Sequence, residues 1–227
     1  MVPKRKRSVS NKRGGLEKVE LSKEKREQLA MQSPSSLQAA MFDWDSLPKV
    51  SVPFLPPKVL SDSEYTLVLD LDETLIHFMQ GEEDSFFLIR PGCTEFLTEL
   101  AKYYELVIFT AALQDYADTV IDQIDPERLI KHRLYRQHTT FINGNIIKDL
   151  NKIGRDTSKA IIVDNVSENF CNQKENGIFI KTWYDDMEDR QLYELIPLLM
   201  QIVENKCQDV KRALTGYRDY MLRKIID

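Results

Sequence analysis

LVLDLDETL, residues 67–75, is the stretch that decides the fold. It begins as a short apolar run of leucine and valine, which is typical of a strand buried on both faces of a sheet. Two aspartates, Asp70 and Asp72, interrupt the run at its carboxyl end. We therefore predict a buried strand over Thr66–Leu71 that delivers two carboxylates to one edge of a sheet.

Apolar runs and helical patterns alternate from this stretch to residue 226. Pro91 suits the first turn of a helix, and Asn143-Gly144 predicts a two-residue hairpin turn within Thr139–Ile147. Strands separated by helices predict an α/β fold with a doubly wound, mainly parallel sheet. The other predicted strands are Ser85–Ile89, Leu106–Thr110, Arg133–Arg136, Ala160–Val163 and Gly177–Lys181, and the predicted helices are Pro91–Tyr103, Gln114–Asp125, Glu188–Asn205 and Asp209–Ile226.

Polar residues stand at the carboxyl ends of three predicted strands. Asp70 and Asp72 end the first, Thr110 ends the second, and Asp164-Asn165 follows the third. Because ligands bind beyond the carboxyl ends of parallel strands, we expect these side chains to meet in one crevice. Close carboxylates repel one another unless a cation neutralises them, and Mg²⁺ prefers such oxygen ligands. The sequence thus predicts a magnesium site and a phosphate-bearing substrate.

The pair Asp70 and Asp72 suits phosphoryl transfer through a covalent intermediate. Residues two apart at a strand end can face the same crevice, so one carboxylate can attack phosphorus while the other handles the proton. Donors must also reach the nonbridging phosphate oxygens. Thr110 offers a hydroxyl for this, and Lys148 offers a positive charge that would also bridge Asp70 and Asp164.

Several separated motifs resemble those of the FCP/SCP, or small C-terminal-domain phosphatase-like, family of the haloacid dehalogenase superfamily. The resemblance covers about 65–210, and its agreement in order and spacing makes it specific. The matching motifs are the quoted stretch together with Arg90-Pro91-Gly92, Phe109-Thr110-Ala111, Lys148-Asp149-Leu150, Gly154-Arg155-Asp156 and Val163-Asp164-Asn165.

The resemblance implies a Mg²⁺-dependent phosphatase of phosphoserine and phosphothreonine in proteins, often in the repeated tail of RNA polymerase II. It implies that Asp70 is the nucleophile and Asp72 the general acid and base. Thr110, Ala111 and Lys148 would bind the phosphate. The metal would be held by Asp70, the Asp72 carbonyl, Asp164 and the neighbouring Asn165.

The chain departs from the family pattern in two places. Only His77–Ile89 separates the first motif from Arg90, so the β insertion is shorter than in most members. Val166 also stands where a serine usually follows the Asp-Asn pair. We find no insertion large enough to be a cap, which argues against a small-molecule phosphatase and suits a protein segment as substrate.

A second class of function stays open. Relatives of this kind can keep the fold as a non-enzymatic scaffold or as a subunit of a mitochondrial import or assembly complex. The short insertion and the long amino-terminal arm would suit that role. The phosphatase is favoured over the scaffold because all the residues expected to act in catalysis are present, namely Asp70, Asp72, Thr110, Lys148 and Asp164.

Charge is unevenly distributed along the 227 residues, which carry a formal −5. Six basic residues precede the first acid, Glu17, and the rest of the chain is strongly acidic. An acidic body argues against direct nucleic-acid binding. No apolar run reaches the ~18 residues that a transmembrane helix needs, and three cysteines without CxxC spacing predict no structural zinc.

The amino-terminal region divides into two predicted parts, followed by a phosphatase domain over 61–227. Residues 1–15 form a basic tail that we expect to be disordered, and residues 16–60 form a helical arm with a proline-containing linker. The helix is predicted over Leu16–Gln32 and the linker over Val50–Lys58. This arm is a candidate surface for a protein partner. Pro3–Arg7 favours nuclear import, with a mitochondrial or cytoplasmic location as the alternative.

Overall fold

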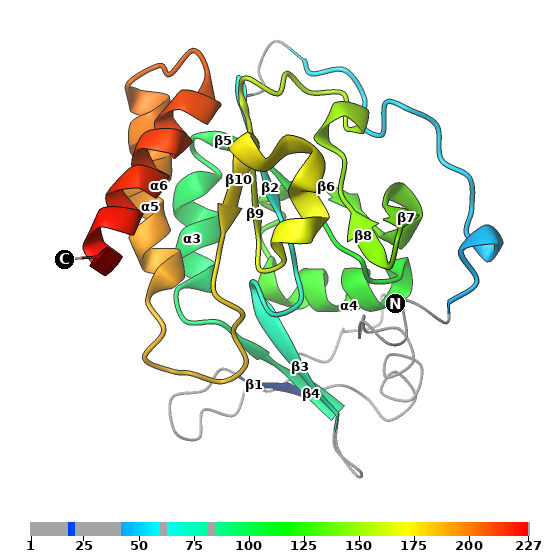
Figure 1. The fold of residues 1–227 in the computed structure, drawn as a ribbon. Helices are drawn as coiled ribbons and strands as arrows, with labels where there is room; N and C mark the ends of the chain where they lie inside the picture. The colour runs from blue at the N-terminus through cyan, green and yellow to red at the C-terminus, as the bar shows by residue number, and fades with distance from the viewer. Residues whose placement is uncertain (1–17, 21–41, 60–62, 81–84, 227) are drawn as a thin grey trace, which may run out of the picture.

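The computed structural model describes residues 18–20, 42–59, 63–80 and 85–226. Five strands form its central sheet: β2 (Tyr65–Leu69), β5 (Tyr104–Phe109), β6 (Ile130–Leu134), β9 (Ala160–Asp164) and β10 (Gly177–Phe179). Their order is β10-β9-β2-β5-β6, and every neighbouring pair is parallel (Figure 1). The chain thus builds outward from β2 in both directions, which confirms the predicted α/β class with a parallel sheet.

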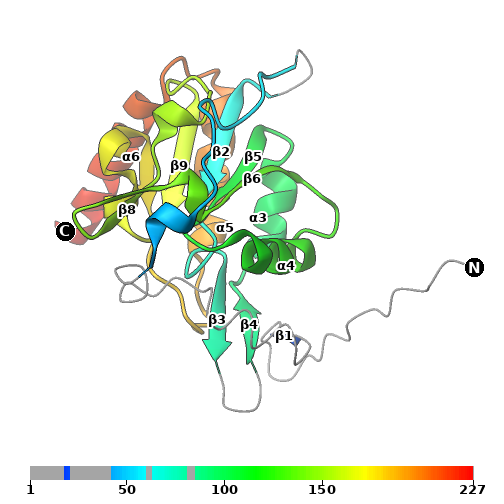
Figure 2. The same cartoon turned by 90° about the vertical axis from the view of Figure 1, so that its right-hand side faces the viewer.

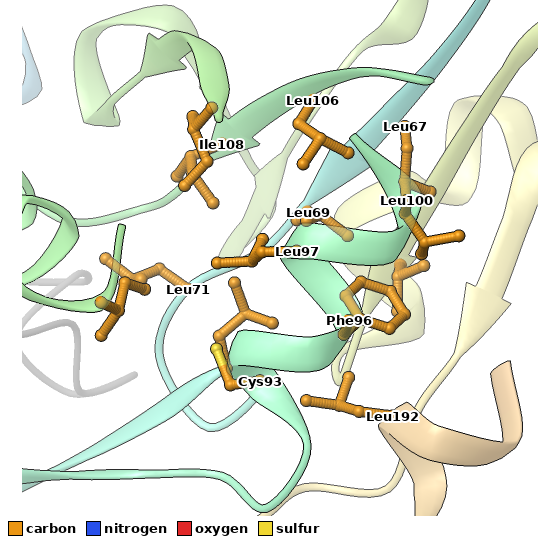
Figure 3. Close-up of a cluster of buried hydrophobic side chains, with 14 of the residues drawn as sticks. Leu67, Leu69, Leu71, Cys93, Phe96, Leu97, Leu100, Leu106, Ile108 and Leu192 are labelled. Atoms are coloured by element: carbon orange, nitrogen blue, oxygen red, sulfur yellow. The ribbon is translucent and has the colours of Figure 1, made fainter. Parts of the chain in front are cut away.

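Four α-helices and two 3-10 helices cover this sheet: α3 (Cys93–Leu100), α4 (Gln114–Ile124), α5 (Gln191–Glu204), α6 (Val210–Ile226), η3 (Leu150–Lys152) and η4 (Ser167–Asn176). Side chains alternate along β2, so Leu67 and Leu69 join a core cluster with all four α-helices, part of which Figure 3 shows. Val68 joins a second cluster with residues of η3 and η4. The α-helices therefore pack on one face, and short 3-10 turns pack on the other.

Several element boundaries differ from the predictions by one to three residues, and strand β3 was not predicted. The strand predicted over Arg133–Arg136 is displaced, because β6 ends at Leu134 and Arg136 opens the 3-10 helix η2 (Arg136–His138). Helix α5 begins at Gln191 and contains Pro197. In the part of the chain that the structure describes, no helix combines the length and apolar character needed to cross a bilayer.

A small antiparallel sheet lies apart from the central one (Figure 2). Its hairpin is β3 (Ile76–Gln80) and β4 (Ser85–Ile89), and β1 (Lys18–Glu20) pairs with the free edge of β4. The helix predicted over Leu16–Gln32 is therefore wrong at residues 18–20, because the backbone there satisfies its hydrogen bonds in a ladder; the other residues of that stretch lie outside the described ones. The hairpin agrees with a short β insertion and no large cap.

The predicted hairpin around Asn143-Gly144 is confirmed. It consists of β7 (Thr140–Ile142) and β8 (Asn145–Ile147), and both turn residues have positive φ, at 51° and 83°. This conformation is what a two-residue turn with matching strand twist requires.

Residues 42–59 pack along the domain upstream of the predicted boundary at residue 61. The segment has no helix or strand over residues 47–59 and bends at residues 52–55, and it makes backbone hydrogen bonds to the domain. Phe54 N–H donates to the Lys152 carbonyl at 2.9 Å, and Leu55 N–H donates to the Ile153 carbonyl at 3.2 Å. Leu55 is buried in the second core cluster. The packed body of the protein therefore includes this segment.

Glu105 of β5 ties several segments together near the amino-terminal end of the sheet. Arg155 donates to both of its carboxylate oxygens at 2.7 Å, and Thr66 Oγ1 donates at 3.0 Å. His132 and Lys58 lie 3.2 and 3.4 Å away. Burial raises the pKa of the Glu105 carboxyl, but hydrogen bonds from Arg155 and His132 outweigh it and hold that pKa well below its ordinary range.

We predict that Glu105→Gln lowers the free energy of unfolding by about 3 kcal/mol at pH 7, because it leaves buried Arg155 without its counter-charge. A carboxyl with a depressed folded-state pKa stabilises fully above its unfolded pKa of about 4.3. The difference between wild type and variant in urea denaturation should therefore be constant above about pH 5 and shrink as the pH falls below about 4. The control, Glu99→Gln, changes an exposed pair with Lys102. If the loss of unfolding free energy in Glu105→Gln did not change with pH, it would contradict a depressed pKa for Glu105.

Candidate active site

The predicted crevice lies where the strand order reverses, between β2 and its neighbours β9 and β5. Asp70 follows β2 directly, and its N–H continues the ladder to the Val163 carbonyl at 3.0 Å. Thr110 follows β5, and Asp164 ends β9. Asp70 and Asp72 are 6% and 4% exposed, so both carboxylates are largely removed from water. Such a switch point is where open parallel sheets bind ligands.

Lys148, which follows β8, places its ammonium group between two of these carboxylates. Its Nζ lies 2.5 Å from Asp70 Oδ1 and 2.6 Å from Asp164 Oδ2, and its side chain is fully buried. Burial lowers the pKa of Lys148, but the charges of Asp164 and Asp70 outweigh it and the pKa is raised. The lysine is therefore charged and joins the ends of β2 and β9.

Asp164 shows that one ammonium does not neutralise the site. Burial and the charge of Asp70 raise its pKa to about 6, although Lys148 and the Val166 N–H act in the opposite direction. Val166 N–H donates to Asp164 Oδ1 at 2.8 Å, and Asn169 Nδ2 donates at 3.1 Å. Asn165 lies beside it, with its amide 3.3 Å from Thr182 Oγ1.

Thr74 holds the second oxygen of Asp70. Its hydroxyl donates to Asp70 Oδ2 at 2.9 Å and lies 3.4 Å from Asn165 Oδ1. The Thr74 carbonyl accepts from Arg90 Nη1 at 3.1 Å, and Arg90 makes two 2.8 Å hydrogen bonds to Asp189. The Asp70 carboxylate is therefore held from two sides, by the Thr74 hydroxyl at Oδ2 and by the Lys148 ammonium at Oδ1.

Only one of the two carboxylate oxygens of Asp72 accepts a hydrogen bond from a described residue. The hydroxyl of Tyr116, from α4, donates to Asp72 Oδ1. Asp72 Oδ2 is buried and has no hydrogen-bond partner among the residues that the structure describes. Burial, followed by the charge of Glu73, raises the pKa of Asp72 well above its ordinary range. A protonated carboxyl with a free oxygen is suited to donate a proton to a ligand.

Thr110 and Ala111 lie at the crevice without a direct contact to the aspartates. Thr110 Oγ1 accepts from the Ala112 N–H at 3.0 Å, and the Ala111 carbonyl accepts from Arg136 Nε at 2.6 Å. Both residues are buried. The structure thus brings Asp70, Lys148 and Asp164 into direct contact. Thr110 and Ala111 lie beyond the end of the neighbouring strand β5.

Tyr116 and Arg136 were not identified from the sequence. Tyr116 is on a helix face that carries mostly core residues, so its pattern indicates packing alone. Arg136 is 3% exposed and is attracted to Asp72, while burial lowers its pKa. Its position at the end of the strand predicted over Arg133–Arg136 was the signal that could have found it.

The donor set fits a magnesium ion. Asp70 and Asp164 share one ammonium, and Asp72 Oδ2 is an orphaned buried oxygen. Within the described residues, no cluster of three or more histidine, cysteine, aspartate or glutamate side chains forms a complete metal cage. Mg²⁺ does not need one, because it binds through one or two carboxylates, carbonyls and retained waters. Asp70 and Asp164 are carboxylates of this kind, and the proposed ligand set is these two residues with the Asp72 carbonyl.

Fold and site together define an α/β protein with an Asp-x-Asp pair at the switch point of its parallel sheet. The family model for NLI interacting factor-like phosphatases matches residues 65–211. The chain therefore belongs to the NLI interacting factor-like phosphatase family, which confirms the resemblance seen in its motifs.

Two curated relatives and one solved structure illustrate the similarity. The chain is 38% identical over 179 residues to CTD small phosphatase-like protein 3 of Caenorhabditis elegans, covering 71% of this chain and 62% of that protein. It is 38% identical over 168 residues to mitochondrial import inner membrane translocase subunit tim50 of Aspergillus fumigatus, covering 71% and 34%. The structure of Fcp1, an essential RNA polymerase II CTD phosphatase, aligns with a TM-score of 0.45 and 20% identity over 69% of this chain and 53% of that chain. The chain thus spans less than two thirds of each of these proteins.

We predict that Lys148→Met destabilises the metal-free protein by about 3–5 kcal/mol, because it leaves two buried carboxylates without their shared cation. Added Mg²⁺ should recover part of that loss, since it supplies the missing positive charge. Thermal denaturation in EDTA and in Mg²⁺ measures both effects. The matched control, Lys131→Met, removes an exposed lysine of β6 and should change little. Equal melting temperatures of Lys148→Met with and without Mg²⁺ would rule out the proposed metal ligands.

Proposed function

We propose that this chain is a Mg²⁺-dependent protein phosphatase that acts on phosphoserine or phosphothreonine through an aspartyl-phosphate at Asp70. The observation that carries the proposal is the fixed orientation of the Asp70 carboxylate. Lys148 holds one oxygen and Thr74 holds the other, next to the buried free oxygen of Asp72. A nucleophile and a proton donor thus stand side by side at the switch point.

The two aspartates divide the reaction. An oxygen of Asp70 attacks phosphorus and forms an acyl phosphate, while the bond from phosphorus to the serine or threonine oxygen breaks. Asp72 donates its proton to that leaving oxygen. Asp72 then accepts a proton from the water that attacks the acyl phosphate, so free phosphate leaves and Asp70 is restored. Tyr116 keeps Asp72 Oδ1 engaged, which leaves Oδ2 for both proton transfers.

The phosphate group is proposed to bind through Thr110, Ala111 and Lys148. The backbone at the end of β5 and the ammonium of Lys148 border the position where the reacting phosphorus must lie. Arg136 adds a second cation beside Asp72, and its two Nη atoms donate to no described residue. Bound Mg²⁺ would neutralise charge on the nonbridging oxygens.

A protein segment is the substrate that the architecture suits. Between β2 and α3 the described residues form only the hairpin β3–β4, so no large domain covers the crevice. Some relatives are named for the carboxyl-terminal domain of RNA polymerase II, and that tail or another nuclear phosphoprotein is the proposed substrate. Nuclear location is proposed from the basic residues 3–7, and residues 16–60 are proposed as a partner-binding arm.

The second candidate function is a non-enzymatic import or assembly subunit. Similarity to the translocase subunit of Aspergillus fumigatus favours it as the alternative. The two functions differ in turnover and in location, so imaging of a tagged chain together with a phosphatase assay separates them. A mitochondrial chain without turnover would support the alternative.

We predict that Asp70→Asn lowers kcat with an aryl phosphate and Mg²⁺ by at least about 10³-fold, because the amide is not a nucleophile. Asp72→Asn should slow hydrolysis of the intermediate by about 10²–10⁴-fold, since general acid–base catalysis is lost. With a good leaving group, Asp72→Asn should release one equivalent of the phenol as a burst. Stopped-flow absorbance measures this.

The control for both variants is Asp185→Asn, which changes an exposed carboxylate. Wild-type turnover no greater than that of Asp70→Asn would contradict the proposed function. A burst from Asp70→Asn but not from Asp72→Asn would reverse the assigned roles.

A further inference from the structure

A groove of about 530 Å³ opens between residues 44–54 and the segment that leads into the hairpin β7–β8. Figure 1 shows the upstream segment running beside β7 and β8. The groove is lined mainly by apolar and aromatic side chains, including Trp44, Val52, Phe54 and Phe141. None of these residues takes part in the chemistry proposed above.

Aromatic contacts hold the two walls of the groove in place. Trp44 stacks on Phe141 with ring centroids 4.9 Å apart and planes 8° from parallel. Phe42 meets Trp44 edge to face at 5.7 Å, and Phe54 meets His138 in the same way at 5.1 Å. Such pairs stabilise a defined geometry beyond their buried area. The groove is therefore a built feature and not a gap beside a loose chain.

Arg136 connects this groove to the candidate active site. Its Nε donates to the carbonyl of Ala111, which follows Thr110 beyond the end of β5. The other face of its guanidinium group lies 4.5 Å from the Phe42 ring and 6.0 Å from the Trp44 ring. One side chain thus separates the catalytic crevice from the aromatic wall.

The exposed groups of the groove define what it would bind. Val50 and Val52 are 36% and 59% exposed, which is unpartnered apolar surface. Lys49 and Lys152 also line the groove, and neither forms an ion pair with any residue that the structure describes. Asp45 is the one acidic residue among the lining residues. The groove therefore offers an apolar surface with an excess of positive charge.

We propose that this groove binds the substrate polypeptide beside its phosphorylated residue and selects segments with a large apolar side chain flanked by acidic residues. The inference rests on the proposed function, because it places the phosphorylated residue at Asp70. The apolar side chain packs against the Trp44–Phe141 stack. The acidic residues pair with Lys49 and Lys152. Residues 42–54 are thereby part of the substrate-binding surface.

The test measures binding of labelled phosphoserine peptides to the full chain carrying Asp70→Asn, by fluorescence anisotropy with Mg²⁺. One peptide set places Leu-Glu-Glu three to six residues before or after the phosphoserine in a Gly-Ser background. The reference set carries Ser-Gln-Gln instead. We expect at least one Leu-Glu-Glu peptide to bind tenfold more tightly than its reference. Trp44→Ala and Lys49→Glu, each added to Asp70→Asn, should remove that preference.

Two matched variants serve as controls. Phe179→Ala truncates an aromatic side chain that is 63% exposed on β10, and Lys131→Glu reverses an exposed lysine on β6. Both should keep the tenfold preference. The inference is overturned if no Leu-Glu-Glu peptide is preferred, or if the preference survives in Trp44→Ala and Lys49→Glu. Absence of aryl phosphate turnover by the wild-type chain is a separate result, which would overturn the proposed function and not the docking of peptides.

Discussion

The ammonium group of Lys148 between Asp70 and Asp164 is the interaction on which the rest of the site depends. Two buried carboxylates at the ends of adjacent strands would repel each other strongly without it. By joining them, Lys148 lets β2 and β9 run parallel and in register up to their polar ends. Burial, followed by the charge of Asp70, raises the pKa of Asp164 to about 6.

The neighbouring contacts convert this ion pair into a reactive arrangement. Thr74 fixes the remaining oxygen of Asp70, and Arg90 fixes Thr74 through its carbonyl. Tyr116 reaches across from α4 to occupy only one oxygen of Asp72. The result is one carboxylate held in a single orientation and another with a free, buried oxygen. The proposed division into a nucleophile, Asp70, and a proton donor, Asp72, rests on that difference between their carboxylates.

Local pattern was sufficient for much of this site. Apolar runs ending in Asp70, Thr110 and Asp164 predict three strand ends at one crevice, because parallel strands share the direction of their carboxyl ends. The central sheet and its helices followed from the same alternation of patterns. Arg136 was missed although the strand predicted over Arg133–Arg136 ended on it, and Tyr116 was missed because its helix face resembles a core stripe. Whether either side chain reaches the site depends on the element that packs opposite it, which a local pattern does not show.

The amino-terminal region shows the same limit. A helical pattern over 16–32 does not reveal that β4 has a free edge, yet residues 18–20 pair with that edge. Likewise, the prolines of residues 50–58 indicate a segment without helix or strand, but they do not reveal that Leu55 enters the core. Segments with few apolar residues take their structure from the surface they meet. That is why the groove beside Arg136 was found only in three dimensions.

The chemistry assigned to Asp70 can be observed directly. The wild-type chain, mixed with Mg²⁺ and a phosphate ester, is quenched in acid during turnover and treated with borohydride, which reduces an aspartyl phosphate to homoserine. Peptide mass spectrometry then locates the reduced residue. We expect homoserine at position 70 and at no other aspartate. Turnover without any reduced aspartate, or with homoserine at position 72, would contradict a covalent role for Asp70.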